Sequence, residues 1–244
     1  MNYTIEIATT DFISTKNAVE GGADRIELCA ALSDGGTTPS AGTIKLCRER
    51  FDTELFPIIR PRSGDFLYTD DEFLIMMHDV LLSKQLGCDG IVTGLLKTNG
   101  SIDKKRTSIL IELAYPMEVT FHRAFDRAKD PFLALEELIE IGCTRILTSG
   151  QQVNAEDGIN LIRQLVELAG ERISIMPGSG VRKENIRSLA ERTGAREFHS
   201  SLRASNASEM KFMHPSFENQ AGNYNNPGIV PGEVLALRKE LENT

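Results

Sequence analysis

One short pattern occurs four times along the chain and limits what the chain can fold into. It reads Gly-Ala-Asp-Arg-Ile at 22–26, and altered copies stand at 87–91, 142–146 and 194–198. Each copy follows an amphipathic stretch, so its glycine suits the left-handed cap of a helix, and the β-branched or aromatic residues after it start a strand. The repeating unit is therefore a helix, a glycine turn and a strand.

Reading outward from these anchors predicts eight strands that alternate with eight helices. The strands are expected at residues 3–8, 25–29, 55–60, 90–93, 118–122, 145–149, 172–176 and 196–200. The helices are expected to begin near Ser14, Ser40, Asp70, Asp103, Pro131, Ala155, Arg182 and Pro231, several of which are capping residues or early prolines. Strands that alternate with helices pair in parallel through right-handed crossovers.

This pattern predicts an α/β fold, a single (β/α)8 TIM-type barrel that fills residues 1–244 as one domain. A doubly wound open sheet is the alternative, but Ala8-Thr9-Thr10-Asp11 stands where that fold carries a glycine-rich dinucleotide fingerprint. The rhythm breaks at residues 202–230, which are rich in serine and asparagine. We expect a long loop there, between strand eight and the last helix, and loops of that length are usually functional lids or disordered.

Charge and hydropathy exclude several classes of partner. The chain has 27 Lys and Arg against 35 Asp and Glu, a net charge of −8 that disfavours nucleic acid and anionic membranes. Charged residues interrupt its first twenty positions, and no segment reaches the roughly 18 apolar residues of a membrane span. The four cysteines are widely spaced without a CxxC pair, which indicates reduced thiols rather than disulfides or a zinc knot. We expect a cytoplasmic protein.

Strand side chains alternate between the barrel axis and the helices, which assigns an inward set. The ionisable members of this set are Glu6, Glu27, Arg60, His122 and His199. Barrel interiors are normally filled with aliphatic residues, so these groups need a reason. A paired ionic core, such as Glu27 with Arg60, is one explanation. Their convergence at the carboxyl ends of strands, where barrel sites form, favours a functional site.

Three further motifs end strands on the same face. Gly178-Ser179-Gly180 follows strand seven, where close backbone approach and a helix N-terminus suit phosphate or carboxylate, although a tight turn explains it equally well. Asp126 follows His122 and would orient it as an acid or base, or would only cap a turn. Ser149 and Gly150 end strand six and are expected in the same ligand site.

Metal binding is a further possibility for the inward set. Glu6, Glu27, His122 and His199 are the oxygen and nitrogen ligands that hold zinc or manganese, but Arg60 in the same mouth disfavours a bare cation. For soft Cu(I), the inward thiol of Cys29 is available.

The chain closely resembles the CutC family, named for copper homeostasis. The matching segments run from about Glu6 to Met213 and include residues 20–29, 35–40, 59–68, 119–126, 147–150 and 176–180. The resemblance implies a TIM-type barrel, a cytoplasmic location and a homo-oligomer, either a dimer or a tetramer. It also implies a role in copper homeostasis with copper bound through cysteine, which makes Cys29 the metal ligand. Many members carry a second Cys where this chain has Ala8.

Two functions follow, and the sequence leaves open whether the protein is an enzyme. The first is a CutC-type copper homeostasis protein. The second is an aldolase, isomerase or hydrolase acting on a small phosphorylated or carboxylated metabolite at the barrel mouth. Its catalytic candidates are Glu6, Glu27, His122, Asp126 and His199, and its ligand-binding candidates are Arg60, Arg62, Ser149, Gly150, Gly178, Ser179 and Gly180. An architectural barrel that works only through partners is a third possibility.

Overall fold

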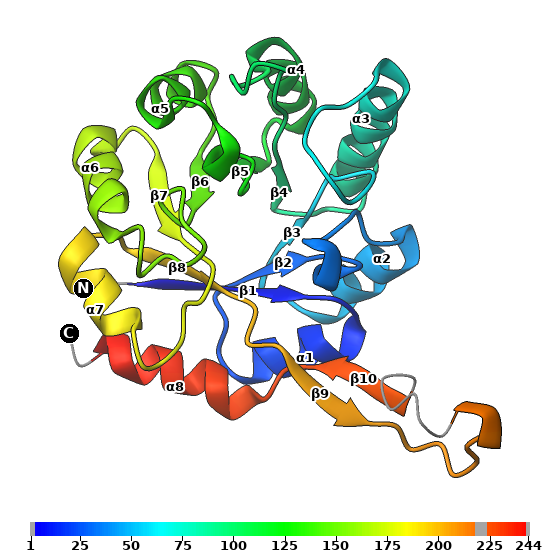
Figure 1. Ribbon diagram of the computed structural model, residues 1–244. Coiled ribbons are helices and arrows are strands. Elements are labelled where there is room, and N and C mark those ends of the chain that lie inside the picture. The colour runs from blue at the N-terminus through cyan, green and yellow to red at the C-terminus, as the bar shows by residue number, and fades with distance from the viewer. Residues whose placement is uncertain (1–2, 218–223, 243–244) are drawn as a thin grey trace.

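A computed structural model describes residues 3–217 and 224–242 and confirms the alternation of strands and helices (Figure 1). The strands of the barrel are β1 (Thr4–Thr9), β2 (Arg25–Leu28), β3 (Glu54–Pro57), β4 (Gly90–Thr93), β5 (Glu118–Phe121), β6 (Arg145–Thr148), β7 (Ser174–Pro177) and β8 (Glu197–Ser200). The helices are α1 (Phe12–Glu20), α2 (Ala41–Arg50), α3 (Asp70–Gln85), α4 (Lys104–Ala114), α5 (Pro131–Glu140), α6 (Ile159–Ala169), α7 (Ile186–Thr193) and α8 (Pro231–Glu242). Figure 1 shows the strands at the centre and the helices around them.

The strands form two parallel sheets, ordered β3-β2-β1-β8 and β4-β5-β6-β7. A bridge between Ile58, directly after β3, and Val92 of β4 connects the two sheets, and the Ile59 amide donates to the Val92 carbonyl at 2.7 Å. β7 and β8 pack side by side, but no ladder joins them in the part of the chain that the structure describes. The arrangement is TIM-type, with its hydrogen bonding interrupted at this seam.

Polar caps set most of the helix starts. Asp11, Ser40, Thr69, Asp103 and Asp130 each accept a hydrogen bond from an amide of the first turn, which satisfies groups that the helix itself leaves unpaired.

Two helices begin four residues later than expected. α6 starts at Ile159 rather than near Ala155, and α7 starts at Ile186 rather than near Arg182. The Ala155 amide instead donates to the Ser179 carbonyl at 3.0 Å, and Ser179 Oγ donates to the Val153 carbonyl at 2.8 Å. These bonds tie the two loops to each other.

Two apolar clusters hold the fold together. The larger one lies between strands and helices, and a smaller one fills part of the barrel interior with Cys29, Phe56, Ile58 and Val92. Burial of these side chains is the main favourable contribution to folding. None of the helices in residues 3–217 and 224–242 is both long and apolar enough to cross a bilayer.

The segment expected as a loop carries structure of its own. β9 (Ala204–Ala207) and β10 (Asn225–Gly228) pair antiparallel, and a 3-10 turn covers Pro215–Phe217. This hairpin extends away from the barrel beside α1 (Figure 1). Pairing satisfies backbone groups that a loop would leave to water, and no sequence periodicity signals it in so polar a stretch. Residues 218–223 of the expected loop lie outside the described residues.

Candidate functional site

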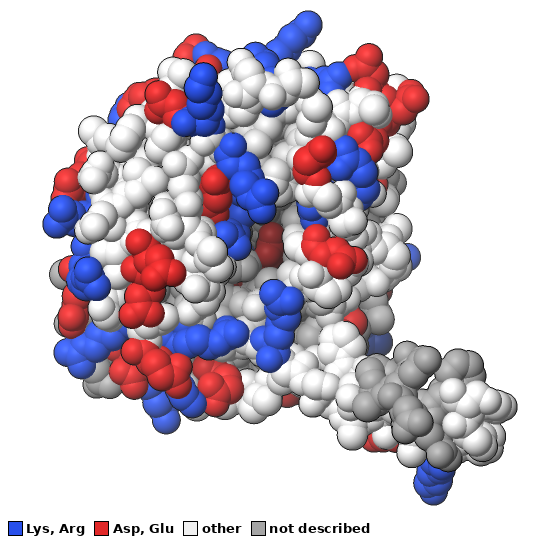
Figure 2. Space-filling view, in the orientation of Figure 1, with Lys and Arg blue, Asp and Glu red and all other residues white. Residues whose placement is uncertain are grey.

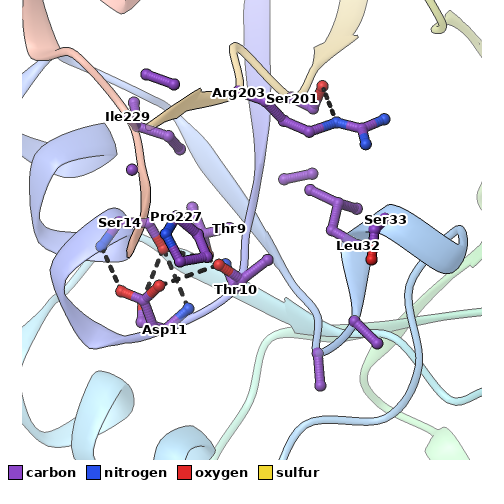
Figure 3. A pocket seen from close by; sticks show the side chains of 15 residues that line it. Thr9, Thr10, Asp11, Ser14, Leu32, Ser33, Ser201, Arg203, Pro227 and Ile229 are labelled. Carbon is purple, nitrogen blue, oxygen red and sulfur yellow. Dashed lines mark hydrogen bonds between the residues drawn. The ribbon is translucent and has the colours of Figure 1, made fainter. Parts of the chain in front are cut away.

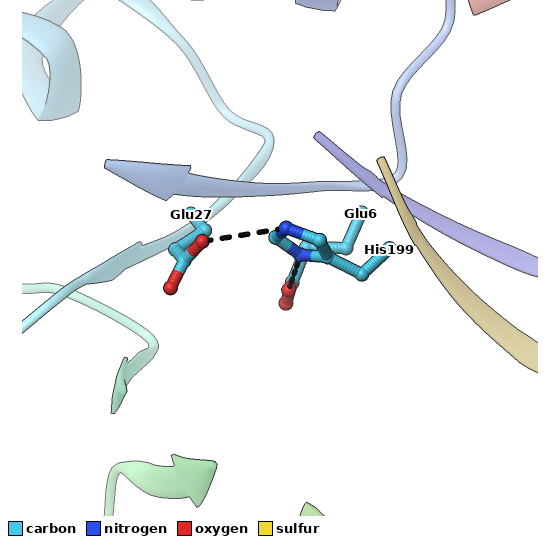
Figure 4. A group of neighbouring side chains, drawn as sticks. All are labelled: Glu6, Glu27 and His199. Atoms are coloured by element: carbon cyan, nitrogen blue, oxygen red, sulfur yellow. Dashed lines mark hydrogen bonds and ion pairs between the residues drawn. The ribbon is translucent and has the colours of Figure 1, made fainter. Parts of the chain in front are cut away.

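Glu6, His199 and Glu27 form a buried chain across three neighbouring strands (Figure 4). His199 Nδ1 lies 2.8 Å from Glu6 Oε1, and His199 Nε2 lies 3.6 Å from Glu27 Oε2. Glu6 faces His199 in the β1–β8 register, and Glu27 comes from β2 on the other side of β1. The alternation of strand side chains therefore brings three of the predicted catalytic residues together.

Glu6, Glu27 and His199 have differently shifted pKa values, because each is affected by its burial and by the charges of the other two. Burial alone would raise the pKa of Glu6, but its bond to His199 and the charges of His199 and Arg25 lower that pKa to about 2. Burial raises the pKa of Glu27 to about 7, and the charge of Glu6 adds to this effect. Burial opposes charging of His199, yet the bond to Glu6 and both carboxylates raise its pKa. The lowered pKa of Glu6 and the raised pKa of His199 favour an ion pair between the two, and the carboxyl of Glu27 titrates near neutrality.

A cavity of about 430 Å³ adjoins the cluster of Glu6, His199 and Glu27, and two of these residues, Glu27 and His199, line it. Figure 2 shows the hollow with basic side chains around it and an acidic group at its floor. Arg123, Arg182 and Arg203 line the cavity. Within residues 3–217 and 224–242, Glu27 is the single carboxylate among the lining residues. The rim is thus positive and the floor holds one titrating acid, which suits an anionic ligand.

His122 lines the cavity and carries a ring nitrogen without a hydrogen-bond partner in the described residues. The Ala124 amide donates to His122 Nδ1 at 3.1 Å, so the ring proton of the neutral imidazole is assigned to Nε2. Burial and the charge of Arg60 lower the pKa of His122 to about 3, which keeps the ring neutral. In the described chain, Nε2 is buried without a partner. Gly94 makes room for the ring, because a Cβ there would lie 2.5 Å from His122 Nδ1.

The two predicted arginine clamps are occupied elsewhere. Arg60 is buried and donates to the carbonyls of Asp34, Gly36 and Gly64, which ties the loop after β2 to the loop after β3. Arg62 forms ion pairs with Glu72 and with Asp65, and it lies outside the lining of the cavity. In this structure both guanidinium groups fasten loops, and neither residue lines the cavity. Their role as ligand clamps stays a prediction.

Asp126 does not pair with His122 as expected. Its carboxylate accepts from the amides of Ser149 and Gln151 and pairs with Arg123 at 2.8 Å. Ser149 Oγ donates to the Asp126 carboxylate at 2.9 Å, so the serine supports the loop instead of lining the cavity. Gly150 is needed for close packing, because a Cβ there would lie 2.4 Å from the Gly158 carbonyl oxygen.

The glycine loop after β7 is only partly at the site. Ser179 and Gly180 line the cavity. Gly178 serves packing, since a Cβ there would lie 2.4 Å from Leu147 and 3.2 Å from the Cβ of His199. Because α7 begins only at Ile186, no helix N-terminus directly follows this loop. The positive helix end that was expected to attract an anion is therefore not next to Gly178–Gly180.

Sequence reasoning missed the three arginines at the rim of the cavity. Arg182 Nη1 lies 3.4 Å from Ser200 Oγ, and Arg203 Nε lies 3.4 Å from Ser201 Oγ. Neither forms an ion pair with a described carboxylate. All three follow strands β5, β7 or β8 within a few residues, and that position was the available signal.

Cys29 lies beneath the cavity, buried with Phe56, Ile58 and Val92. Burial, together with the charges of Glu27 and Glu6, raises the pKa of its thiol well above the ordinary value. Among the described residues, the potential metal-binding cluster comprises Glu6, Glu27 and His199, whose ligand atoms lie within 4.8 Å of one another. Its donors are oxygen and nitrogen, which suit borderline and hard cations better than Cu(I).

Comparison with known proteins identifies the family. The family model described as CutC family matches residues 3–204. A relative from Chromobacterium violaceum, named family protein CutC, is 46% identical over 99% of each chain. The chain belongs to the CutC family.

Other relatives of this CutC-family protein extend to animals and to solved structures. A human relative named copper homeostasis protein cutC homolog is 45% identical over 88% of this chain and 78% of its own. A structure named for a copper homeostasis protein CutC of Streptococcus agalactiae is 33% identical, covers 81% of this chain and 97% of its own, and superimposes with a TM-score of 0.77. Thiamine phosphate pyrophosphorylase of Pyrococcus furiosus covers 99% and 96%, with a TM-score of 0.59 at 15% identity, and shares the fold.

Proposed function

We propose that this protein acts in copper homeostasis and that the site at the barrel mouth is where it acts. Membership of the CutC family carries the proposal, together with the name of the human relative. We further propose that the chain works as a single domain in the cytoplasm and assembles as a homo-oligomer, as expected from the sequence and its family resemblance. Direct binding of copper would use Cys29, whose thiol must lose its proton to become a ligand.

Replacing Cys29 by serine tests the direct copper role. We expect Cys29→Ser to lower the affinity for Cu(I) by at least about tenfold, since a first ligand is lost. Wild-type affinity should also rise with pH, because the raised pKa of this buried thiol makes the thiolate scarce at neutrality. A competition titration against a chelator whose Cu(I) complex is coloured measures both. Cys143→Ser is the matched control, a second buried thiol. Equal affinities in all three proteins would mean that copper acts without Cys29.

A specific observation favours a second candidate function, acid–base catalysis on a small anionic ligand. Glu27 has a pKa of about 7 and lies at the floor of a cavity rimmed by arginines. In this proposal a rim arginine holds the anion, His122 Nε2 donates a hydrogen bond to a ligand oxygen, and Glu27 gives or takes a proton. Glu6 keeps His199 charged and oriented beside Glu27.

Phosphate binding tests this second function. We expect inorganic phosphate to raise the melting temperature of the protein, and Arg182→Gln to weaken the binding by about tenfold, since a charge-assisted bond contributes about 1.5–3 kcal/mol. Arg187→Gln is the matched control, because Arg187 lies on α7 and pairs with Glu191 on the surface. Differential scanning fluorimetry across a phosphate series gives the apparent affinity. The proposal would be contradicted if phosphate did not raise the melting temperature of the wild-type protein, or if both variants lost the same amount of phosphate affinity.

A further inference from the structure

A second cavity of about 480 Å³ adjoins the first one. Leu32, Ser201 and Arg203 line both, so the two spaces meet along a shared wall. The second cavity lies between the end of β1, the turn after β2 and the base of the β9–β10 hairpin (Figure 3). Asn17 Nδ2 on α1 donates to the Ile229 carbonyl at 3.0 Å, which fixes the hairpin side of the wall.

Four polar side chains of this second cavity, those of Thr9, Thr10, Asp11 and Ser14, already form hydrogen bonds within the protein. Thr9 Oγ1 lies 2.9 Å from Thr15 Oγ1, and Thr10 Oγ1 donates to Asp11 at 3.0 Å. Asp11 also accepts from the Ser14 amide at 2.8 Å as the cap of α1. Figure 3 shows the bonds among Thr10, Asp11 and Ser14. What the threonines offer a ligand is therefore mainly their methyl groups.

Aliphatic groups complete the lining. Ala8, Ala30, Leu32, Pro227 and Ile229 face this cavity, and Ile229 and Ala8 are buried. The first cavity differs, because arginines, two histidines and Glu27 line it. Arg203 lies where the two spaces meet. The two adjoining cavities thus offer a charged part and an apolar part, and binding sites of this composition orient a ligand by its polar end.

We propose that the two cavities form one bipartite site for an elongated organic anion. Its anionic group, a phosphate ester or a carboxylate, binds the charged half, and its apolar end fills the half lined by Ala30 and Ile229. The inference rests on the proposed anion site and adds the shape and apolar character of its ligand. Arg203 at the junction contacts the anionic group from the side of the apolar half.

The test compares probes that differ only in apolar length. Isothermal titration with methyl phosphate and butyl phosphate, and separately with acetate and hexanoate, gives four dissociation constants. We expect butyl phosphate to bind at least about tenfold more tightly than methyl phosphate, because each buried methylene contributes about 0.8 kcal/mol, roughly a fourfold change. A gain in only one series identifies the anionic group as phosphate or carboxylate.

Filling the apolar half provides the matched variants. Ala30→Leu and Ala204→Leu place extra volume in the second cavity from two different elements, and we expect either one to remove the advantage of butyl over methyl phosphate. Ala41→Leu, at the exposed start of α2, should keep it. Methyl phosphate should bind all four proteins alike. Short and long probes that bind wild type equally would overturn the bipartite site alone, whereas failure of every anion to bind would overturn the underlying anion site.

Discussion

Glu27→Gln should make the protein more stable at pH 8, by about 3 kcal/mol, and change its stability little at pH 4. Folding raises the pKa of Glu27 from its ordinary value of 4.5 to about 7, so the folded state holds this proton where the unfolded state has lost it. A shift of that size corresponds to about 3 kcal/mol. The favourable contribution of the protonated carboxyl is complete below pH 4.5 and is lost as the pH rises through 7. Glutamine keeps the shape and stays neutral.

Urea denaturation at the two pH values measures this difference. Glu49→Gln is the matched control, because Glu49 lies on the surface of α2 beside Lys45 and should change stability by less than about 1 kcal/mol at either pH. A gain for Glu27→Gln that is the same at pH 4 and pH 8 would show that burial of charge is not its cause. A positive result would mean that the fold tolerates a destabilising carboxyl at its cavity, a pattern typical of functional sites.

The parts of this molecule that follow from periodicity could be predicted from the sequence. Reading outward from the repeated helix, glycine and strand unit locates seven of the eight barrel strands to within about two residues, the usual uncertainty of element ends, whereas β3 ends three residues earlier than expected. Period-two alternation then places Glu6, Glu27 and His199 on the inner face. Their convergence needs no more information than this, because the neighbouring parallel strands fix it.

The parts that depend on hydrogen bonds between loops could not be predicted. Arg60 follows β3 as a ligand-binding arginine would, but its nitrogens donate to the carbonyls of Asp34 and Gly64, in loops whose paths no periodicity describes. Asp126 likewise accepts a hydrogen bond from Ser149, which is distant in sequence, and does not pair with its neighbour His122. The late start of α7 has the same origin. A side chain at the end of a strand has several possible hydrogen-bond partners, and the backbone geometry of the loops decides which one it binds.

Arg25→Met should cost the protein about 3–5 kcal/mol of stability, because it removes one partner from a buried network of charges. Arg25 pairs with Glu6 at 3.3 Å and with Glu197 at 2.8 Å, and Arg145 also pairs with Glu197. Glu6 connects this network to His199, because its second carboxylate oxygen lies 2.8 Å from His199 Nδ1. Methionine preserves contact with Phe56, whose ring centroid lies 5.0 Å from the guanidinium carbon, but leaves Glu6 without its arginine.

The exposed ion pair of Arg172 and Glu136 is the matched control, because it shows whether the loss of stability comes from burial of the charges or from loss of the ion pair itself. Arg172 makes two hydrogen bonds to Glu136, at 2.7 and 2.8 Å, with about half of each side chain exposed. We expect Arg172→Met to cost less than about 1 kcal/mol, since water replaces what the pair provides. Urea midpoints with unchanged slopes compare the two variants. Similar small losses would mean that water reaches Glu6 once Arg25 is gone. A large loss for Arg25→Met alone would show that the buried carboxylates around Arg25, including Glu6 at the base of the site, need this arginine as their partner.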